Sequence, residues 1–106
     1  MFRALSDTVL VADRQLRPED MEAVAAAGVA LIVNNRPDGE EPGQPAGAEI
    51  EAAARAAGLD YRHIPVSGGI RPDQVAAMAA AMGEGKLLAF CRSGARSTLL
   101  WAMAAR

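Results

Sequence analysis

The sequence predicts a three-layer α/β domain in which helices cover both faces of a mainly parallel, four-stranded sheet. Four short apolar segments rich in strand-forming residues alternate with four alanine-rich segments that carry helix start and stop signals. The connections between successive strands are too long for hairpins, which calls for parallel strands joined by crossover helices. A chain of 106 residues has the size of one domain with a modest core, so we expect a single domain over residues 1–106.

The first half of the chain contains two predicted strands and one helix. Residues 8–12 form a short apolar run and are the first strand. Residues 18–27 begin with Pro18 and two carboxylates in the first turn and stop at Gly28, which marks both ends of a helix. Residues 29–33 are continuously apolar, as expected for an interior parallel strand covered on both faces.

The second half repeats the alternation. The expected elements are a helix over 46–57, a strand over 61–66, a helix over 72–82, a strand over 86–90 and a final helix from 95 to the C-terminus. Pro65 cannot donate a ladder hydrogen bond, so the 61–66 strand is expected near a sheet edge. The loops over 35–45 and 67–71 leave the carboxyl ends of strands, where functional sites of open α/β sheets lie.

Composition excludes several classes of partner. The net charge is −2 and the isoelectric point is about 5.3, so we expect neither nucleic acid nor a membrane surface as a partner. The single cysteine cannot form an internal disulfide, and no signal-like or membrane-length apolar segment is visible. We therefore expect a cytoplasmic protein. Positive charge is local: Arg71, Arg92 and Arg96 fall in or near segments expected at one end of the sheet.

Cys91 is the strongest functional candidate. It follows the last predicted strand and opens a turn that leads into the final helix. Backbone N–H groups that converge in such a turn, together with a helix N-terminus and a guanidinium, favour a thiolate. We expect Cys91, Arg96 and Ser97 to be catalytic, with the Ser97 hydroxyl bonded to the sulfur. The expected substrate-binding residues are Arg92, Ser93, Gly94 and Ala95. The alternative is a buried cysteine before an ordinary helix cap.

These motifs also carry a family resemblance. Residues 91–97, Cys-Arg-Ser-Gly-Ala-Arg-Ser, resemble the active-site loop of rhodanese-type sulfurtransferases and, less closely, the phosphate loop of protein tyrosine phosphatases. Together with residues 13–20, 32–40 and 63–66 they resemble the phosphatase-like domain of the beta-lactamase-hydrolase-like proteins, over nearly the whole chain. The resemblance implies a dual-specificity-phosphatase-like fold. Members are described as phosphatases or sulfurtransferases, sometimes fused to a persulfide dioxygenase, which is a possible partner here.

The spacing in the cysteine loop favours sulfur transfer. Four residues separate Cys91 from Arg96, one fewer than in tyrosine phosphatases, and a tighter loop suits a single sulfur atom better than a phosphoryl group. Phe90 stands where those enzymes commonly have histidine, and Ser67 where an acid is common. We therefore predict a cysteine-dependent sulfurtransferase that passes sulfane sulfur from a small anionic donor through a Cys91 persulfide to a thiol or cyanide.

Two other functions stay open. One is a phosphatase that acts on a phosphoester through a cysteinyl-phosphate, and the other is a non-catalytic anion-binding or partner-binding module. The predicted sulfur transfer requires no metal and no organic cofactor. It leaves open the sulfur donor, the acceptor and the oligomeric state.

The remaining polar residues have structural interpretations as their first expectation. Asp73 is expected to stabilise a helix start, and Asp38 and Glu40 to be charged surface residues, although both could reach the mouth of the site. His63 is expected to be a packed or edge residue without a role.

Three polar residues close the central strand. Asn34 and Asn35 are expected to bond to local backbone, with support of the cysteine loop as the alternative. Arg36 is expected to be either solvated or part of an anion-attracting field.

Overall fold

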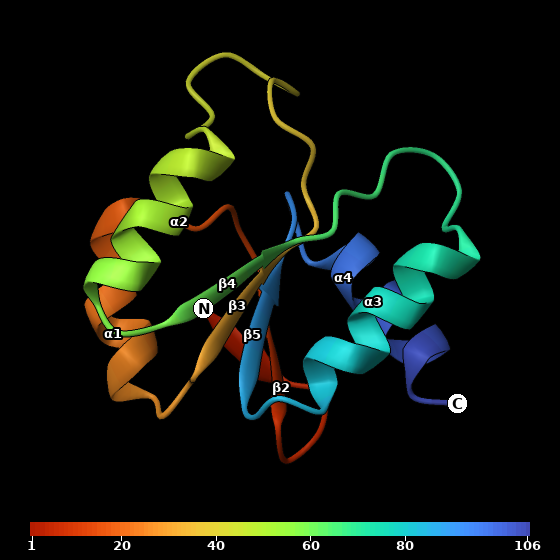
Figure 1. Ribbon diagram of the computed structural model, residues 1–106. Coiled ribbons are helices and arrows are strands. Elements are labelled where there is room, and N and C mark those ends of the chain that lie inside the picture. Colours follow the sequence, from red (N-terminus) through yellow and green to blue (C-terminus); the bar gives the residue numbers. More distant parts are fainter.

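The structure, a computed structural model, describes residues 1–106 and contains five strands, four α-helices and one 3-10 helix (Figure 1). In chain order these are β1 (Phe2–Ala4), β2 (Val9–Ala12), η1 (Pro18–Asp20), α1 (Met21–Ala26), β3 (Leu31–Asn34), α2 (Gly47–Ala56), β4 (Asp60–His63), α3 (Pro72–Met82), β5 (Leu87–Phe90) and α4 (Ala95–Ala104). Every strand and helix expected from the sequence is present, with boundaries shifted by a few residues at most.

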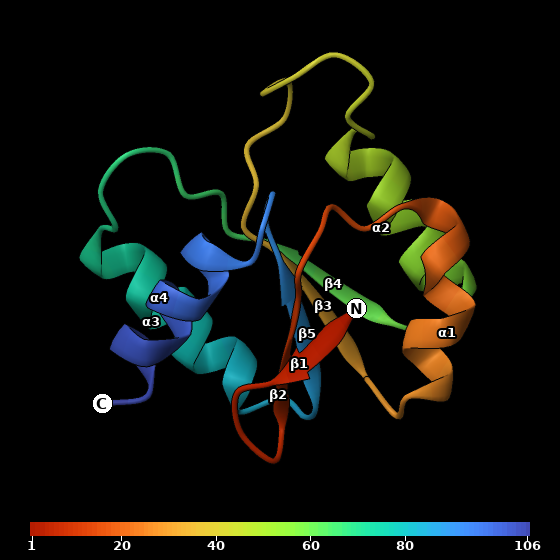
Figure 2. The same cartoon turned by 180° about the vertical axis from the view of Figure 1, so that it is seen from behind.

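The elements form three layers. The sheet has the order β1-β2-β5-β3-β4, with α1 and α2 on one face and α3 and α4 on the other (Figures 1 and 2). Side chains of the interior strands alternate between the two cores: Ile32 of β3 and Phe90 of β5 face α1 and α2, whereas Val33 and Ala89 face α3 and α4. This arrangement confirms the predicted α/β class.

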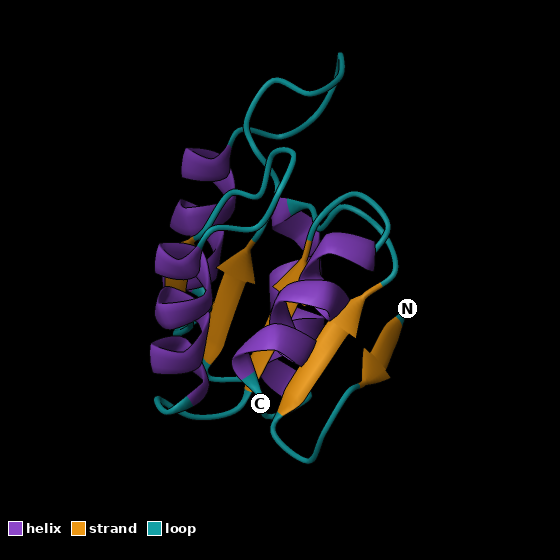
Figure 3. Ribbon diagram, turned by 90° about the vertical axis from the view of Figure 1, so that its right-hand side faces the viewer, coloured by secondary structure: helices purple, strands orange, loops and turns teal.

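The edge strand β1 was not predicted from the sequence. β1 pairs antiparallel with β2, with Phe2 opposite Ala12, and forms one edge of the sheet (Figure 3). The prediction of four strands is therefore wrong by one, and the sheet is mixed. Arg3 and Ala4 are exposed, so this edge strand carries no buried apolar run that a sequence pattern could show.

The parallel part of the sheet positions the loops. β2, β5, β3 and β4 all run in the same direction, so their carboxyl ends meet along one edge, where the connecting loops gather (Figure 3). β5 is the middle strand, and residues 87–90 are all buried. The residue after it, Cys91, therefore lies at the centre of that edge.

The helices cover the sheet and are short. The expected helix over 18–27 is divided into η1 and α1. β4 lies at the second edge of the sheet, as expected, but it ends at His63, so Pro65 lies beyond the strand. None of the four helices has the length and apolar character needed to cross a lipid bilayer.

Candidate active site

The Cys91 thiol lies inside the turn between β5 and α4. Cys91 is only 1% exposed, and the backbone N–H of Gly94 donates a hydrogen bond to its Sγ at 3.1 Å. The backbone of the loop itself therefore holds the thiol.

The surroundings of the sulfur favour its ionised form. Burial raises the pKa of Cys91. Hydrogen bonds from the backbone N–H groups of four loop residues, Ser97, Gly94, Ser93 and Arg96, lower it by more than burial raises it, so the pKa lies below the usual range. Convergent amides of this kind are also a site for a negative charge that develops next to the sulfur. The loop can therefore present a nucleophilic thiolate.

Gly94 makes this turn possible. Its φ is +97°, a left-handed conformation that side chains disfavour. A Cβ at this position would also lie 2.8 Å from the carbonyl oxygen of Ala12 and 3.3 Å from a methyl carbon of Val11. The loop consequently packs directly on the end of β2, with no room for a larger residue.

Arg96 joins three loops at the carboxyl edge. Its Nη1 donates to the carbonyl oxygen of Val66 at 2.8 Å and to Glu40 Oε2 at 2.8 Å, and its Nη2 donates to Glu40 Oε1 at 2.9 Å. The hydrogen bond from Arg96 is the main reason why the pKa of Glu40 falls to about 2. The pKa of Arg96 is raised, chiefly by Glu40 and also by the Cys91 thiolate.

Arg36 is buried, whereas the sequence left open whether it is solvated or part of an anion-attracting field. Only 2% of it is exposed, and its guanidinium donates to Glu40 Oε1 at 2.8 Å, to Gln15 Oε1 at 3.0 Å and to Glu41 Oε1 at 3.0 Å. It thereby ties the loop after β2 to the loop after β3. Sequence reasoning missed this role because an arginine in a charged loop is usually solvated.

The Ser97 hydroxyl does not bond to the sulfur as expected. Its Oγ donates to Asn35 Oδ1 at 2.8 Å, and only the backbone N–H of Ser97 acts on the thiol. Asn35 in turn donates from Nδ2 to the carbonyl oxygen of Ile64 at 3.0 Å. Both side chains are buried. Asn35 therefore supports the start of α4, which was the alternative considered for it, and Ser97 acts through its main chain.

Asn34 and His63, at the ends of β3 and β4, make structural contacts. Asn34 donates to the Tyr61 hydroxyl at 3.0 Å and accepts from the Arg36 backbone N–H at 2.9 Å. His63 is exposed on the edge strand, and its Nε2 lies 2.9 Å from the Arg36 carbonyl oxygen. These contacts hold the start of the loop over 35–46, in agreement with the structural interpretation of His63.

The expected substrate-binding residues lie around the thiol. Arg92, Ser93 and Ala95 are exposed at the mouth of the loop. The Arg92 guanidinium is 70% exposed and comes no closer than 3.9 Å to Glu41. It is the one arginine of the site that can turn toward a ligand without breaking a short ion pair.

The carboxyl groups near the loop differ in their partners. Asp38 Oδ1 accepts from the Gly47 N–H at 2.7 Å at the start of α2. Asp73 pairs with Arg71 at 3.0 Å on the surface, and Glu40 and Glu41 pair with the arginines described above. Glu40 and Glu41 are thus held in ion pairs, whereas Asp38 has only a backbone N–H as partner and the exposed Asp13, next to Ala12, lies 3.8 Å from the N-terminal amine.

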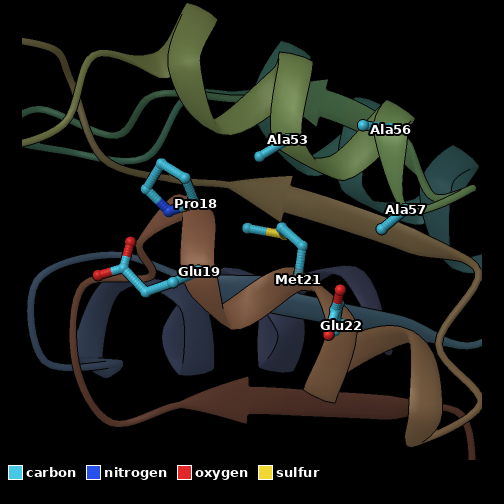
Figure 4. A pocket seen from close by; sticks show the side chains of 7 residues that line it. All are labelled: Pro18, Glu19, Met21, Glu22, Ala53, Ala56 and Ala57. Carbon is cyan, nitrogen blue, oxygen red and sulfur yellow. The ribbon is translucent and has the colours of Figure 1, made fainter.

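The one cavity of the surface lies away from the cysteine. It has a volume of about 480 Å³ between η1, α1 and α2 (Figure 4). Its lining is formed by Pro18, Glu19, Met21, Glu22, Ala53, Ala56 and Ala57. No residue of the cysteine loop contributes to it, so the candidate active site lies outside this cavity.

The fold and the loop define a class of protein. A thiol cradled by main-chain N–H groups between the middle strand of a parallel sheet and the following helix is the arrangement of cysteine-dependent phosphatase-like domains. Within this class, the chain belongs to the family of the beta-lactamase hydrolase-like protein, phosphatase-like domain, whose model matches residues 1–106. The resemblance seen in the sequence is confirmed.

Curated relatives carry the same family name. A beta-lactamase hydrolase-like protein of Agrobacterium fabrum is 42% identical over 87 residues, which are 79% of this chain and 20% of that protein. One from Xylella fastidiosa is 45% identical over 82 residues, 74% of this chain and 19% of that protein. The chain therefore spans about a fifth of the length of these relatives.

Solved structures confirm the fold. A candidate phosphatase from Neisseria meningitidis superimposes with a TM-score of 0.83 at 34% identity, covering 92% of this chain and 71% of that one. A candidate phosphatase from Shewanella putrefaciens gives 0.83 at 21% identity, with 97% and 66% covered. A kinase-associated phosphatase with its catalytic cysteine replaced by serine gives 0.73 at 16% identity, with 91% and 63% covered. The last two show the fold alone.

Proposed function

We propose that this domain is a cysteine-dependent sulfurtransferase built on a phosphatase-like fold. The observation that carries the proposal is that Glu40 and Glu41, the carboxylates nearest the arginines of the cysteine loop, are held in ion pairs with those arginines and with Arg36. Expulsion of an alkoxide from a phosphoester needs a proton from a general acid, whereas sulfite, a sulfinate or a low-pKa thiolate leaves without one. A loop that supplies a thiolate, and whose neighbouring glutamates are held in ion pairs, suits the second chemistry.

The reaction is a double displacement. The Cys91 thiolate attacks the outer sulfur of the donor, an S–S bond forms to Cys91, and the donor's own S–S bond breaks with its electron pair leaving on sulfite, a sulfinate or a thiolate. An acceptor thiolate or cyanide then attacks the outer sulfur of the Cys91 persulfide. The products are a new persulfide or thiocyanate, and the Cys91 thiolate is restored with no net oxidation.

Each residue of the loop has a part in this scheme. The N–H groups that lower the pKa of Cys91 also suit the terminal charge of the persulfide. Arg92 attracts the anionic donor, and the Arg96 guanidinium stands beside the thiolate. Ser97 contributes its backbone N–H, while its hydroxyl fixes the loop on Asn35.

A phosphatase is the second candidate, because the comparisons favour it. The matching family is a phosphatase-like domain and the structural relatives are described as phosphatases, which supports cysteine-dependent phosphatase chemistry more directly than sulfur transfer. In that reaction the Cys91 thiolate would attack phosphorus and form a cysteinyl-phosphate that water then hydrolyses.

Parallel assays separate the two reactions. Wild type and Cys91→Ser are compared for transfer from thiosulfate and from methanethiosulfonate to cyanide, and for hydrolysis of an aryl phosphate. We expect thiocyanate from the wild type only, and a mass increase of about 32 Da, one sulfur atom, on Cys91 after treatment with the donor. Release of phosphate by the wild type without thiocyanate from either donor would overturn the proposal and establish the phosphatase.

A further inference from the structure

The contact between Glu40 and Arg96 resembles a bound ligand. Both carboxylate oxygens of Glu40 accept from the two terminal nitrogens of Arg96, at 2.8 and 2.9 Å. This paired geometry is the one in which arginine binds the oxygens of carboxylate, sulfate or phosphate ligands. Glu40 therefore uses the donors that an incoming oxyanion would otherwise use.

Glu40 is fixed in this position from its other side. Arg36 Nε donates to Glu40 Oε1 at 2.8 Å, and the Glu40 backbone N–H donates to Gln44 Oε1 at 3.0 Å. The Gln44 amide in turn donates to the Pro37 carbonyl oxygen at 2.9 Å. The side chains of Glu40 and Arg96 are only 29% and 28% exposed. A ligand cannot displace this carboxylate without breaking bonds to two arginines.

The charges of the site balance without a ligand. Three guanidinium groups, those of Arg36, Arg92 and Arg96, face two carboxylates, Glu40 and Glu41, and one thiolate. A bound monoanion adds one negative charge, and Arg92 and the loop N–H groups are available to bind it. A dianion adds two charges in a partly desolvated place where like charges repel strongly.

We propose that Glu40 sets the charge preference of the site, so that monoanionic sulfur donors such as thiosulfonates and persulfides are accepted in preference to dianions such as thiosulfate. The inference deepens the proposed sulfur transfer and rests on it for the identity of the donor. Glu40 acts here as a residue that determines specificity, and it takes no part in bond making.

The kinetic test compares the two donors in the wild type and in Glu40→Gln, which removes the charge and keeps the size. We expect the ratio of kcat/KM for thiosulfate to kcat/KM for methanethiosulfonate to rise about tenfold in Glu40→Gln, because Arg96 becomes free for the second charge. Glu49→Gln removes the same charge from the start of α2, where Glu49 forms no ion pair, and leaves the ratio unchanged. An equal fall for both donors in Glu40→Gln would mean that Glu40 only positions Arg96, and would overturn the inference.

A binding test needs no turnover. Iodoacetamide is uncharged and alkylates the Cys91 thiolate, and an anion that occupies the loop slows this reaction. We expect sulfate, a dianion, to protect Glu40→Gln at about tenfold lower concentration than the wild type, while methanesulfonate, a monoanion, protects both alike. Equal protection of both proteins by sulfate would overturn the inference. Failure of the proposed function has a different signature, namely no thiocyanate from either donor in the wild type.

Discussion

Two loops leave the carboxyl edge of the sheet side by side, and they are built by opposite means. The loop after β5 holds the Cys91 sulfur with backbone N–H groups and needs only Gly94 to close. The loop after β3 is held by charged side chains, with Arg36 and Glu40 at its centre. The contrast teaches that the path of the main chain lowers the pKa of the thiol, whereas the charged side chains beside it carry the proposed discrimination among anions.

Breaking the main-chain loop has the largest expected effect. In Gly94→Ala the new methyl group meets the Ala12 carbonyl oxygen at 2.8 Å in a left-handed conformation. We expect a loss of about 3 kcal/mol in the free energy of unfolding, from steric crowding and backbone strain together. The pKa of Cys91, measured from the pH dependence of alkylation, should rise toward that of an ordinary thiol.

A second glycine provides the matched control. Gly69 has open space around its Cα and no positive φ, so Gly69→Ala should leave both the stability and the thiol pKa close to those of the wild type. If Gly94→Ala behaved like Gly69→Ala in urea unfolding and in alkylation, the role of the main-chain loop described here would be wrong.

Breaking the charged loop has a smaller effect on stability. Arg36→Met removes the hydrogen bonds to Gln15, Glu40 and Glu41 and should cost about 2 kcal/mol in the free energy of unfolding. The pKa of Cys91 should hardly change, because the N–H groups that lower it remain. Arg71→Met, at a surface pair with Asp73 that is more than half exposed, is the control and should leave the free energy of unfolding close to that of the wild type.

The smallest expected effect is the change with pH in the free energy of unfolding that Glu40 contributes. The pKa of Glu40 is about 2 in the folded chain against an ordinary 4.5, so its charge stabilises the fold above pH 4.5, and this contribution is lost as the pH falls toward 2. Glu40→Gln should therefore lower the free energy of unfolding by about 1 kcal/mol at pH 6, after screening by solvent, and by less near pH 2. Unfolding curves at both pH values check this. An equal loss at both would assign the effect to packing instead.

The fold could be predicted where local patterns decide the structure. The helix over 72–82 and the buried strand before Cys91 were predicted within a residue, because Pro72 and the run over 87–90 are strong local signals. β1 could not be predicted, since its only reason to be a strand is its pairing with β2 at an exposed edge.

The candidate site likewise has one part that the sequence predicts and one part that it does not. The converging N–H groups follow from the short motif at Cys91, and the sequence was sufficient to predict them. The partners of the charged loop lie far apart in the sequence: Arg36 is 21 residues from Gln15, Glu40 is 56 from Arg96, and Asn35 is 62 from Ser97. No local pattern shows such pairs, which explains why the buried ion pairs of Arg36 were not expected and why the Ser97 hydroxyl was expected at the sulfur.

The contact of Gly94 with Ala12 also bears on the order of folding. β2 and β5, which pair with Val9 opposite Leu87, come from the two ends of the chain, and closing so long a stretch is entropically costly and slow. The support for the cysteine turn exists only after this pairing, because Ala12 ends β2. We therefore expect the thiol of an incompletely folded chain, in which β2 and β5 are not yet paired, to keep the pKa of an ordinary thiol, and rapid alkylation of Cys91 before this pairing would contradict the expectation.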